Sequence, residues 1–285
     1  MPAQILDGSA TARTIRAEMA AEVARFQAAT GVTPGLAIVM GGDDPASRSY
    51  VRAITRTAEQ AGLRCRQVTA DPAAGDAGLR DLIDGLNHDA DVHGVIVQLP
   101  LPAPLTQVAV TATLDPRKDV DGITPFSAGR LLLGQTGFVP STPLGGLELL
   151  RRYGISAYGL DATVVGRSPV VGKPMALLLL NEHATVTICH TRTRDLVAAC
   201  RRADLLCSAV GQASLITRDM VKPGAVVLDF GTTPGPDGKL VGDVDFAGAS
   251  DVASWISPVP GGTGPMTTAV LLRNTLQAAK AQVGT

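Results

Sequence analysis

Apolar and polar positions along this chain follow two alternating patterns. Short runs of Val, Ile, Leu and Ala, bounded by turn-forming residues, are typical of buried strands. The predicted strands are Leu36–Met40, Val92–Gln98, Ala162–Val165, Thr185–Cys189, Leu205–Val210 and Ala225–Phe230. The longer segments between them predict helices over Ala10–Ala29, Ser47–Ala61, Asp76–His88, Thr142–Arg152 and Lys173–Glu182. Because strands and helices alternate, we predict an α/β fold with parallel sheets and crossover helices.

The length of 285 residues fits two domains, and two segments rich in Pro and Gly mark the expected boundaries, at 119–143 and 258–265. The segment Met266–Ala281, after the second boundary, has helical character and is expected to pack back on the first domain. We therefore predict an amino-terminal domain of residues 1–122 that is completed by residues 266–285, and a carboxyl-terminal domain of residues 123–265.

Composition and charge narrow the class of protein. Hydrophobic residues make up 45% and charged residues 18% of the chain, which excludes a disordered protein. A formal net charge of −1 and 3% aromatic residues disfavour nucleic acids and anionic membranes as partners. The sequence opens without the basic and apolar segments of a secretory signal, and its most apolar stretch, Met175–Leu180, is too short to span a bilayer. We therefore expect a soluble cytoplasmic protein.

The four cysteines are Cys65, Cys189, Cys200 and Cys207, and no two of them form a C-x-x-C pair. Their spacing fits neither a zinc site nor a disulfide framework. We interpret them as buried apolar residues in a reducing compartment, and we expect no metal site.

A glycine-rich turn follows the predicted strand Ala162–Val165 and leads into an apolar helix. It contains Gly166 and Gly172, with Arg167 and Ser168 directly after the first glycine. A turn of this kind at the end of a parallel strand directs backbone N–H groups and a helix N-terminus at the pyrophosphate of a dinucleotide. The G-x5-G spacing differs from the G-x-G-x-x-G fingerprint, so an ordinary strand-to-helix turn stays open as an alternative.

The next strand, Thr185–Cys189, is followed by His190, Thr191 and Arg192, and the first acidic residue after it is Asp195. An acid at this strand end binds the ribose 2′-hydroxyl of NAD, whereas basic and hydroxyl groups suit the additional phosphate of NADP. A solvated basic loop would contain the same residues. Because the turn and the strand end indicate the same ligand, we predict NADP as the cofactor.

Six longer motifs, spread along nearly the whole chain, resemble those of one enzyme family. They are residues 42–51 (GDDPASRSYV), 94–102 (GVIVQLPLP), 116–122 (PRKDVDG), 166–175 (GRSPVVGKPM), 241–246 (VGDVDF) and 258–267 (PVPGGTGPMT). In this order they are similar to the signatures of the bifunctional methylenetetrahydrofolate dehydrogenase/methenyltetrahydrofolate cyclohydrolases, the FolD family. An ordered set of motifs of this length makes the resemblance highly specific.

The resemblance implies a three-layer α/β catalytic domain at the amino terminus and a Rossmann domain for NADP at the carboxyl terminus. It also implies a homodimer, with the folate substrate bound in the cleft between the two domains. The dehydrogenase reaction passes a hydride from the methylene bridge of methylenetetrahydrofolate to the nicotinamide and leaves a methenyl cation. The cyclohydrolase reaction adds water to that cation and opens it to formyltetrahydrofolate, and neither step requires a metal.

The resemblance further implies roles for individual residues. Tyr50 corresponds to the aromatic residue that stacks on the aminobenzoyl part of folate, Gln98 to the glutamine that hydrogen-bonds the catalytic lysine, and Asp121 to the carboxylate that orients the pterin. Pro260 and Gly261 match the loop that closes over the folate. The residues matched to the cofactor site are Gly166, Arg167, Ser168, His190, Thr191, Arg192 and Thr232. Taken singly, Tyr50 also suits the edge of a core, Gln98 a strand cap and Asp121 a turn.

The chain departs from the family pattern at one catalytic position. The family's lysine lies four residues after the tyrosine, and this chain has Ile54 there. We expect a helix that starts near Asp44–Pro45, so that positions 50 and 54 share a face one turn apart. Isoleucine provides no donor, base or charge, while Arg52 and Arg56 point away and keep their protons at accessible pH. The first lysine of the chain is Lys118.

The two reactions depend on this position differently. Hydride transfer moves no proton and needs the two rings held face to face. Addition of water needs proton transfer, for which general acid–base catalysis is typically worth about a hundred- to ten-thousandfold in rate. We therefore predict a dehydrogenase with weak or absent cyclohydrolase activity. Three alternatives stay open: a bifunctional enzyme in which Asp121 activates water, a non-catalytic paralogue that binds folate or NADP, and an enzyme for another cyclic aminal.

Overall fold

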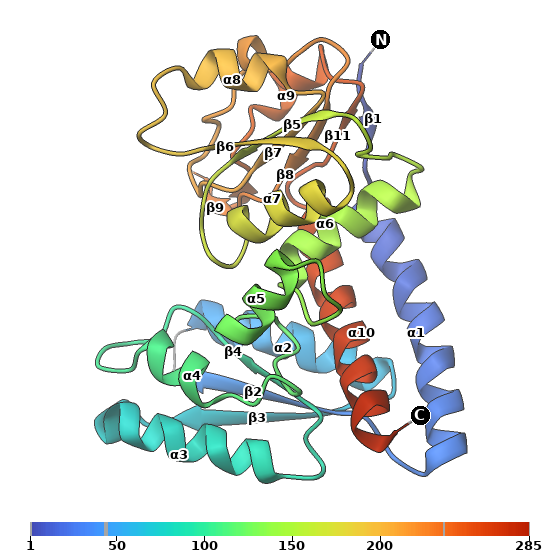
Figure 1. Ribbon diagram of the computed structural model, residues 1–285, viewed down its shortest axis with the longest axis vertical. Coiled ribbons are helices and arrows are strands. Elements are labelled where there is room, and N and C mark those ends of the chain that lie inside the picture. The colour runs from blue at the N-terminus through green and yellow to red at the C-terminus, as the bar shows by residue number, and fades with distance from the viewer. Residues whose placement is uncertain (1, 43–44, 236, 285) are drawn as a thin grey trace. The chain divides into compact units, whose positions relative to one another are not determined.

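The computed structural model describes residues 2–42, 45–235 and 237–284 and divides into two compact units. Unit 1 comprises Met1–Arg13 and Pro140–Val270, and unit 2 comprises Thr14–Val139 and Leu271–Thr285. The units thus divide after residues 13, 139 and 270, whereas the domain boundaries expected from the sequence lie after residues 122 and 265. Two long helices contribute residues to both units (Figure 1); they are α1 (Gly8–Thr30) and α10 (Thr263–Val283).

Unit 1 is built around a six-stranded sheet in the order β1-β11-β8-β7-β5-β6, and all its paired strands are parallel. Its strands are β1 Gln4–Ile5, β11 Trp255–Ile256, β8 Val226–Asp229, β7 Leu205–Ser208, β5 Asp161–Val165 and β6 Thr185–Cys189. A short antiparallel ladder after β8 joins β9 (Thr233–Pro234) to β10 (Leu240–Val241). The central strands β7 and β8 are buried along their whole length, which is the pattern of a parallel sheet covered on both faces.

Helices cover both faces of the sheet of unit 1. They are α6 Ser141–Arg152, α7 Gly172–Asn181, α8 Leu196–Arg202 and α9 Phe246–Ser250, with a single 3-10 turn, η2, at Arg218–Met220. α8 and α9 pack on one face through a cluster that includes Val165, Leu206 and Val227. α6 packs on the opposite face, where a side-chain carbon added to Gly146 would contact Leu228, and α7 lies next to α6.

Unit 2 has three layers around a parallel three-stranded sheet in the order β3-β2-β4. Its strands are β2 Gly35–Gly41, β3 Arg64–Ala70 and β4 Gly94–Val97, and its helices besides α1 and α10 are α2 Pro45–Gln60, α3 Gly75–His88, α4 Gln107–Thr113, α5 Pro125–Leu132 and the 3-10 turn η1 Pro72–Ala74. Because side chains alternate along a strand, Ile38 and Ile96 face the cluster formed with α1, α2 and α10, while Val39 and Val95 face α3 and α4.

All the strands and helices predicted from the sequence are present, and the predicted α/β architecture with parallel sheets is confirmed. In the last helix, Nδ2 of Asn274 donates to the carbonyl oxygen of Val120 at 2.9 Å, and both residues belong to unit 2. Strand β7 ends at Ser208, earlier than expected, because the N–H of Val210 donates to the carboxylate of Asp243 instead of to a neighbouring strand.

Two further expectations concern the start of the second helix and the burial of the cysteines. Asp44, at the expected start of the second helix, lies outside the described residues, and α2 is described from Pro45. Cys189, Cys200 and Cys207 are buried as predicted, but the prediction for Cys65 is wrong, because this residue is only half-buried. It lies on β3, an edge strand of the small sheet, where its Sγ contacts the hydroxyl of Thr55.

Candidate functional site

Gly166 begins a tight turn directly after the last residue of β5 and touches the next loop of the sheet. Its φ of +123° lies in a region that L side chains rarely adopt. A Cβ at this position would lie 2.3 Å from the carbonyl oxygen of Ala209, in the loop after β7. The N–H of Gly166 donates to the carbonyl oxygen of Cys189 at 2.9 Å. Glycine is therefore required here both by the backbone angle and by the close approach of a second chain segment.

Ser168 holds the end of this turn, three residues before Val171, the N-cap of α7. Its Oγ accepts hydrogen bonds from the N–H groups of Val171, at 3.1 Å, and Gly172, at 3.3 Å. A Cβ on Gly172 would lie 2.3 Å from the carbonyl oxygen of Gly166, so the two glycines predicted from the sequence lie back to back. The side chain of Arg167 is exposed beside them. A compact turn with an exposed cation and a following helix fits the pyrophosphate and phosphates of a dinucleotide.

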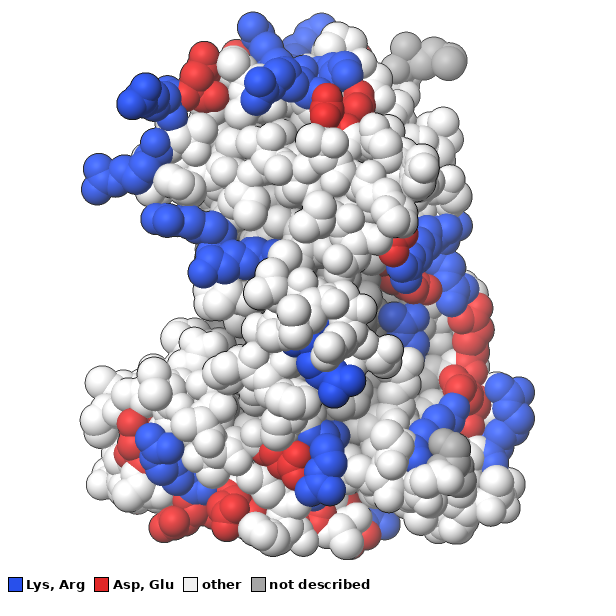
Figure 2. Space-filling view, in the orientation of Figure 1, with Lys and Arg blue, Asp and Glu red and all other residues white. Residues whose placement is uncertain are grey.

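The end of β6 lies beside this turn, because Val165 pairs with Cys189 in a parallel ladder. His190 is half-buried: its N–H donates to Oγ1 of Thr193, and its Nδ1 accepts from the N–H of Arg192 at 3.0 Å. Thr191 and Arg192 are exposed. In Figure 2, the side of unit 1 that bears β6 and α8 is bordered by Lys and Arg side chains.

The first acidic residue after β6 has a structural role. Asp195 is the N-cap of α8, and its Oδ1 accepts a hydrogen bond from the N–H of Ala198 at 2.9 Å. It is thus engaged at the helix start and not at the strand end, where an NAD-type acid belongs. The strand end therefore presents hydroxyl, imidazole and guanidinium groups, and these fit the 2′-phosphate of NADP.

Three of the predicted residues line one cavity of about 460 Å³ in unit 1, namely Thr232, Pro260 and Gly261. The remaining lining residues are Ser9, Gly231, Leu240, Pro258, Val259, Gly262, Thr263, Gly264 and Pro265. The structure thus brings a residue matched to the cofactor site together with two residues matched to the substrate loop.

A larger cavity, of about 730 Å³, lies in unit 2 near the amino-terminal end of β4, and its lining includes none of the predicted residues.

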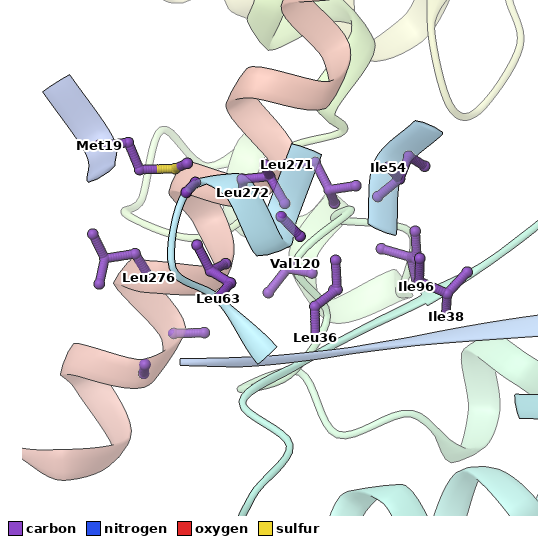
Figure 3. Packing of buried hydrophobic residues seen from close by; sticks show 14 of the residues in the cluster. Met19, Leu36, Ile38, Ile54, Leu63, Ile96, Val120, Leu271, Leu272 and Leu276 are labelled. Carbon is purple, nitrogen blue, oxygen red and sulfur yellow. The ribbon is translucent and has the colours of Figure 1, made fainter. Parts of the chain in front are cut away.

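Tyr50 and Ile54 lie one turn apart on α2, and their environments differ sharply. Tyr50 is 42% exposed, whereas Ile54 is fully buried at 0%. Ile54 belongs to the same apolar cluster as Ile38 of β2 and Ile96 of β4, and Figure 3 shows these three side chains beside one another. Position 54 therefore lies over the face of the sheet to which alternate residues of β4 point.

Gln98 directly follows β4, at the carboxyl end of this sheet, and Asp121 follows a residue that bridges to β4. The N–H of Gln98 continues the ladder by donating to the carbonyl oxygen of Val39 at 2.9 Å, and its Nε2 donates to the carbonyl oxygen of Leu99 at 3.0 Å. Asp119 bridges Val95 in parallel, and Asp121 lies in the turn that follows, where the N–H of Gly122 donates to the carbonyl oxygen of Asp119 at 3.0 Å. Gln98 also follows Ile96 by two residues and so alternates to the face that Ile54 covers.

Asp119, which we did not predict, fixes the turn that presents Asp121. It is fully buried and accepts hydrogen bonds from the N–H groups of Ile123 and Thr124 and from the hydroxyls of Thr124 and Ser127. Burial raises the pKa of its carboxyl group, and these four hydrogen bonds oppose the shift. The position of Asp121 is thereby set by a buried carboxylate two residues before it.

Two family models match the chain. The model of the tetrahydrofolate dehydrogenase/cyclohydrolase catalytic domain matches residues 6–121, and the model of the NAD(P)-binding domain of the same family matches residues 140–283. The chain belongs to the tetrahydrofolate dehydrogenase/cyclohydrolase family. The predicted fold class, an α/β catalytic domain followed by a Rossmann-type NAD(P)-binding domain, is thereby confirmed.

Members of the tetrahydrofolate dehydrogenase/cyclohydrolase family from several organisms match over nearly their whole length. The chain is 52% identical over 282 residues to the bifunctional protein FolD of Roseiflexus castenholzii, covering 99% of this chain and 98% of the relative. The crystal structure of FolD from Campylobacter jejuni superposes with a TM-score of 0.95 at 42% identity, covering 98% of this chain and 99% of the other. The FolD structure from Trypanosoma brucei, complexed with NADP cofactor and an inhibitor, superposes with a TM-score of 0.95 at 37% identity and covers both chains completely.

The matched NAD(P)-binding domain agrees with the prediction of a nicotinamide dinucleotide cofactor, and the trypanosomal relative is complexed with NADP. None of the helices within the described residues has the length and apolar character needed to cross a membrane.

Proposed function

We propose that this chain is an NADP-dependent methylenetetrahydrofolate dehydrogenase whose cyclohydrolase activity is weak or absent. The observation that carries the proposal is the fully buried Ile54, at the position of the family's catalytic lysine. Ile54 covers the sheet face to which Gln98 alternates, so a lysine at this position would be directed at the site. The resemblance further supports a cytoplasmic location and a homodimer. Light scattering of the purified protein would test the homodimer.

In this proposal the residues of unit 1 bind and orient the cofactor. NADP, when bound, accepts a hydride at its nicotinamide ring. The turn at Gly166 and Ser168 holds the phosphates, and Arg167 with His190 and Thr191 faces the 2′-phosphate. Thr232 lines the cavity that also contains the loop matched to the folate. These groups act by positioning, which is the main requirement of hydride transfer between two rings.

The residues of unit 2 bind the folate. Tyr50 presents a ring that is partly exposed and so suited to stacking on an aminobenzoyl group. Asp121, on the turn fixed by Asp119, accepts hydrogen bonds from the ring N–H and amino groups of the pterin. Neither role requires a proton to move. The dehydrogenase reaction is therefore compatible with isoleucine at position 54, and the absence of a nearby ammonium favours formation of the methenyl cation.

Addition of water requires an acid–base group, and Arg52, Arg56 and Lys118 are poorly placed to take over this role from the family's lysine. Arg52 and Arg56 are exposed, on the side of α2 opposite to Ile54. Lys118 is buried, and its Nζ donates to the carbonyl oxygens of Leu86 and Asp89, near the amino-terminal end of β4. We therefore propose that hydrolysis of the methenyl cation proceeds close to its rate in buffer.

A fully bifunctional enzyme is the second candidate, and the names of the relatives favour it, because proteins about half identical to this chain are called bifunctional. In that case Asp121 would activate water. A non-catalytic paralogue and an enzyme for another cyclic aminal are further alternatives. Calorimetric titration with tetrahydrofolate, followed by an NADP-reduction assay with methylenetetrahydrofolate, distinguishes them: the paralogue binds without turnover, and an enzyme for another aminal does neither.

Replacement of Arg167 with alanine is expected to raise the Michaelis constant for NADP about ten- to hundredfold and to leave that for NAD nearly unchanged. A charge-assisted contact to the 2′-phosphate is worth about 1.5–3 kcal/mol, and NAD lacks this phosphate. Steady-state kinetics with both dinucleotides measures the effect. Arg201→Ala, which removes an exposed arginine on α8 of the same unit, is the control. Equal changes for the two cofactors would show that Arg167 does not contact the 2′-phosphate.

Replacement of Asp121 with asparagine is expected to weaken binding of tetrahydrofolate by about 2 kcal/mol, because it removes one charge-assisted hydrogen bond while keeping the shape of the side chain. Calorimetric titration of the variant and the unaltered protein measures the difference. Asp115→Asn, in the preceding turn, where the carboxylate pairs with Arg117, is the matched control. Unchanged folate affinity in the Asp121 variant would assign this residue a structural role in the turn.

A further inference from the structure

Two buried carboxylates in unit 1 lie outside the predicted site and organise the loops around it. Asp229 is the last residue of β8, and Asp243 lies in the motif at residues 241–246; they are 3% and 0% exposed. Oδ1 of Asp229 accepts from the N–H groups of Gly231, at 2.8 Å, and Asp243, at 3.0 Å, and its Oδ2 accepts from the N–H of Val244 at 2.9 Å. Asp229 thus holds both the loop after β8 and the segment that contains Asp243.

Asp243 in turn holds the loop after β7. Its Oδ2 accepts from the N–H of Val210 at 2.7 Å and from the hydroxyl of Ser208 at 3.2 Å. Its Oδ1 accepts from the N–H of Gln212 at 3.0 Å. Two N–H groups of an exposed loop are therefore bound to one carboxylate that is itself inaccessible to solvent.

The loops held by this pair are in contact with the predicted cofactor site. Ala209, next to Val210, is the residue whose carbonyl oxygen would lie 2.3 Å from a Cβ on Gly166. On the other side, a Cβ on Gly231 would lie 2.3 Å from Oδ1 of Asp243, and Gly231 lines the 460 Å³ cavity next to Thr232. The two carboxylates thus connect the dinucleotide turn with the cavity.

The same cavity is tied to Asp229 from a second direction. The hydroxyl of Thr263, which lines the cavity, donates to the backbone carbonyl oxygen of Asp229 at 2.8 Å. The backbone N–H of Asp229 donates to Oγ of Ser257, directly before the loop that contains Pro260. A side-chain carbon on Gly242 would lie 1.9 Å from Oδ2 of Asp229, so the segment packs against this carboxylate without room for movement.

Ionisation of the buried carboxyl group of Asp229 lowers the stability of the folded state. The pKa of Asp229 is raised to about 6: burial is the main cause and the nearby charge of Asp243 adds to it, while the three N–H donors oppose the shift. Because the pKa is raised above its ordinary value, this group stabilises the fold most at acidic pH, and that contribution is lost as the pH rises through about 6.

The strand order shows which part of the cofactor these loops meet. The dinucleotide turn follows β5, and the groups suited to the 2′-phosphate follow β6, on one side of β5. β7 and β8 lie on the other side of β5. A dinucleotide with its pyrophosphate at the β5 turn and its adenosine half over β6 extends its nicotinamide half towards the loops after β7 and β8.

We propose that Asp229 and Asp243 are positioning residues that lock these two loops into the geometry that receives the nicotinamide half of the dinucleotide. The inference rests on the proposed NADP-dependent function. Neither carboxylate contacts the cofactor; each acts through the loop that it holds.

Asp243→Asn tests this role. An amide has one acceptor oxygen, so its NH₂ group must face either the N–H of Gln212 or the pair formed by Val210 and Ser208. One segment of the loop then loses its acceptor. We expect the dissociation constants for NADP and NAD to rise by the same factor, about tenfold, because the nicotinamide half is common to both. Calorimetric titration measures this, and the Michaelis constant for NADP should rise while kcat at saturating cofactor changes little.

Asp245→Asn is the matched control, because it changes the same residue type in the same motif but affects only the N-cap of α9. Because Asn and Asp are comparable N-cap residues, it should change thermal stability little and leave the dinucleotide affinities unchanged. Should Asp243→Asn fail to fold, Ser208→Ala removes one of the bonds to Asp243 and should weaken binding of both dinucleotides about threefold.

Three results would count against the proposal. A folded Asp243→Asn variant with unchanged affinity for both dinucleotides overturns the positioning role and leaves the proposed function intact. The same holds for unchanged affinity in Ser208→Ala if that variant is the one measured. Failure of the unaltered protein to bind either dinucleotide overturns the proposed function itself.

Discussion

Replacement of Ile54 with lysine is expected to raise the rate of methenyltetrahydrofolate hydrolysis by about a hundredfold, the lower end of what general acid–base catalysis provides. The new side chain would extend from the apolar cluster towards the carboxyl end of β4, where the amide oxygen of Gln98 is a suitable acceptor. Burial lowers the pKa of an ammonium in such surroundings and so allows it to exchange a proton with water. The dehydrogenase rate should change little or fall, because a positive charge near the folate opposes the methenyl cation.

The substitution also has a cost in stability. Ile54 is fully buried between α2 and the sheet, so a partly desolvated ammonium should lower the free energy of unfolding by about 2–4 kcal/mol. Denaturant titration measures this loss. Ile54→Met is the matched control, because it keeps the volume and supplies no proton-transferring group. If the methionine variant gains hydrolysis to the same extent, loosened packing and not the ammonium is responsible.

Replacement of Gly166 with alanine is expected to weaken NADP binding by more than about a hundredfold. The backbone angle of +123° strains any L side chain, by about 1–3 kcal/mol. The new Cβ would also lie 2.3 Å from the carbonyl oxygen of Ala209, which is backbone and cannot rotate away. The turn must therefore move, and a shift of about 1 Å in a positioning element commonly costs a hundredfold. Calorimetric titration with NADP measures the effect, and tetrahydrofolate binding should be retained.

The Gly154→Ala variant distinguishes the effect of backbone strain at a positive φ from the effect of a steric clash of the new Cβ. Gly154 follows α6 in the same unit with a φ of +70°, and a Cβ there would meet no atom within 4 Å. This control should lower stability by about 1–2 kcal/mol and leave NADP affinity unchanged. A Gly166→Ala variant that binds NADP as well as the Gly154→Ala control does would contradict the assignment of this turn to the cofactor.

The elements that could be predicted are those whose burial is visible in the local pattern. The strand Leu36–Met40 is apolar throughout because both of its faces are covered, and α3 repeats its buried residues at helical spacing. β3 was missed because it is an edge strand with mostly exposed polar residues. β1 was missed because it contains only two residues and depends on pairing with Trp255 and Ile256, at the far end of the chain.

The candidate site divides in a similar way. Gly166 and Ser168 could be predicted because a tight turn restricts residue types at a fixed spacing. Ile54 could be identified because the family motif has a lysine four residues after the tyrosine, and this chain has isoleucine there. The roles of Asp119, Asp229 and Asp243 could not be assigned, because the sequence does not distinguish a buried aspartate from an exposed one. Their partners are backbone N–H groups, which every residue type except proline provides. Only the folded chain shows which loops these carboxylates hold.

The most direct test of the proposed function uses the unaltered protein with methylenetetrahydrofolate and NADP. The methenyl product, followed by its ultraviolet absorbance, should accumulate and then decay at the rate measured in buffer alone. Addition of methenyltetrahydrofolate itself should give the same decay with and without protein. Hydrolysis well above the buffer rate would contradict the proposed consequence of Ile54 and would identify a fully bifunctional enzyme.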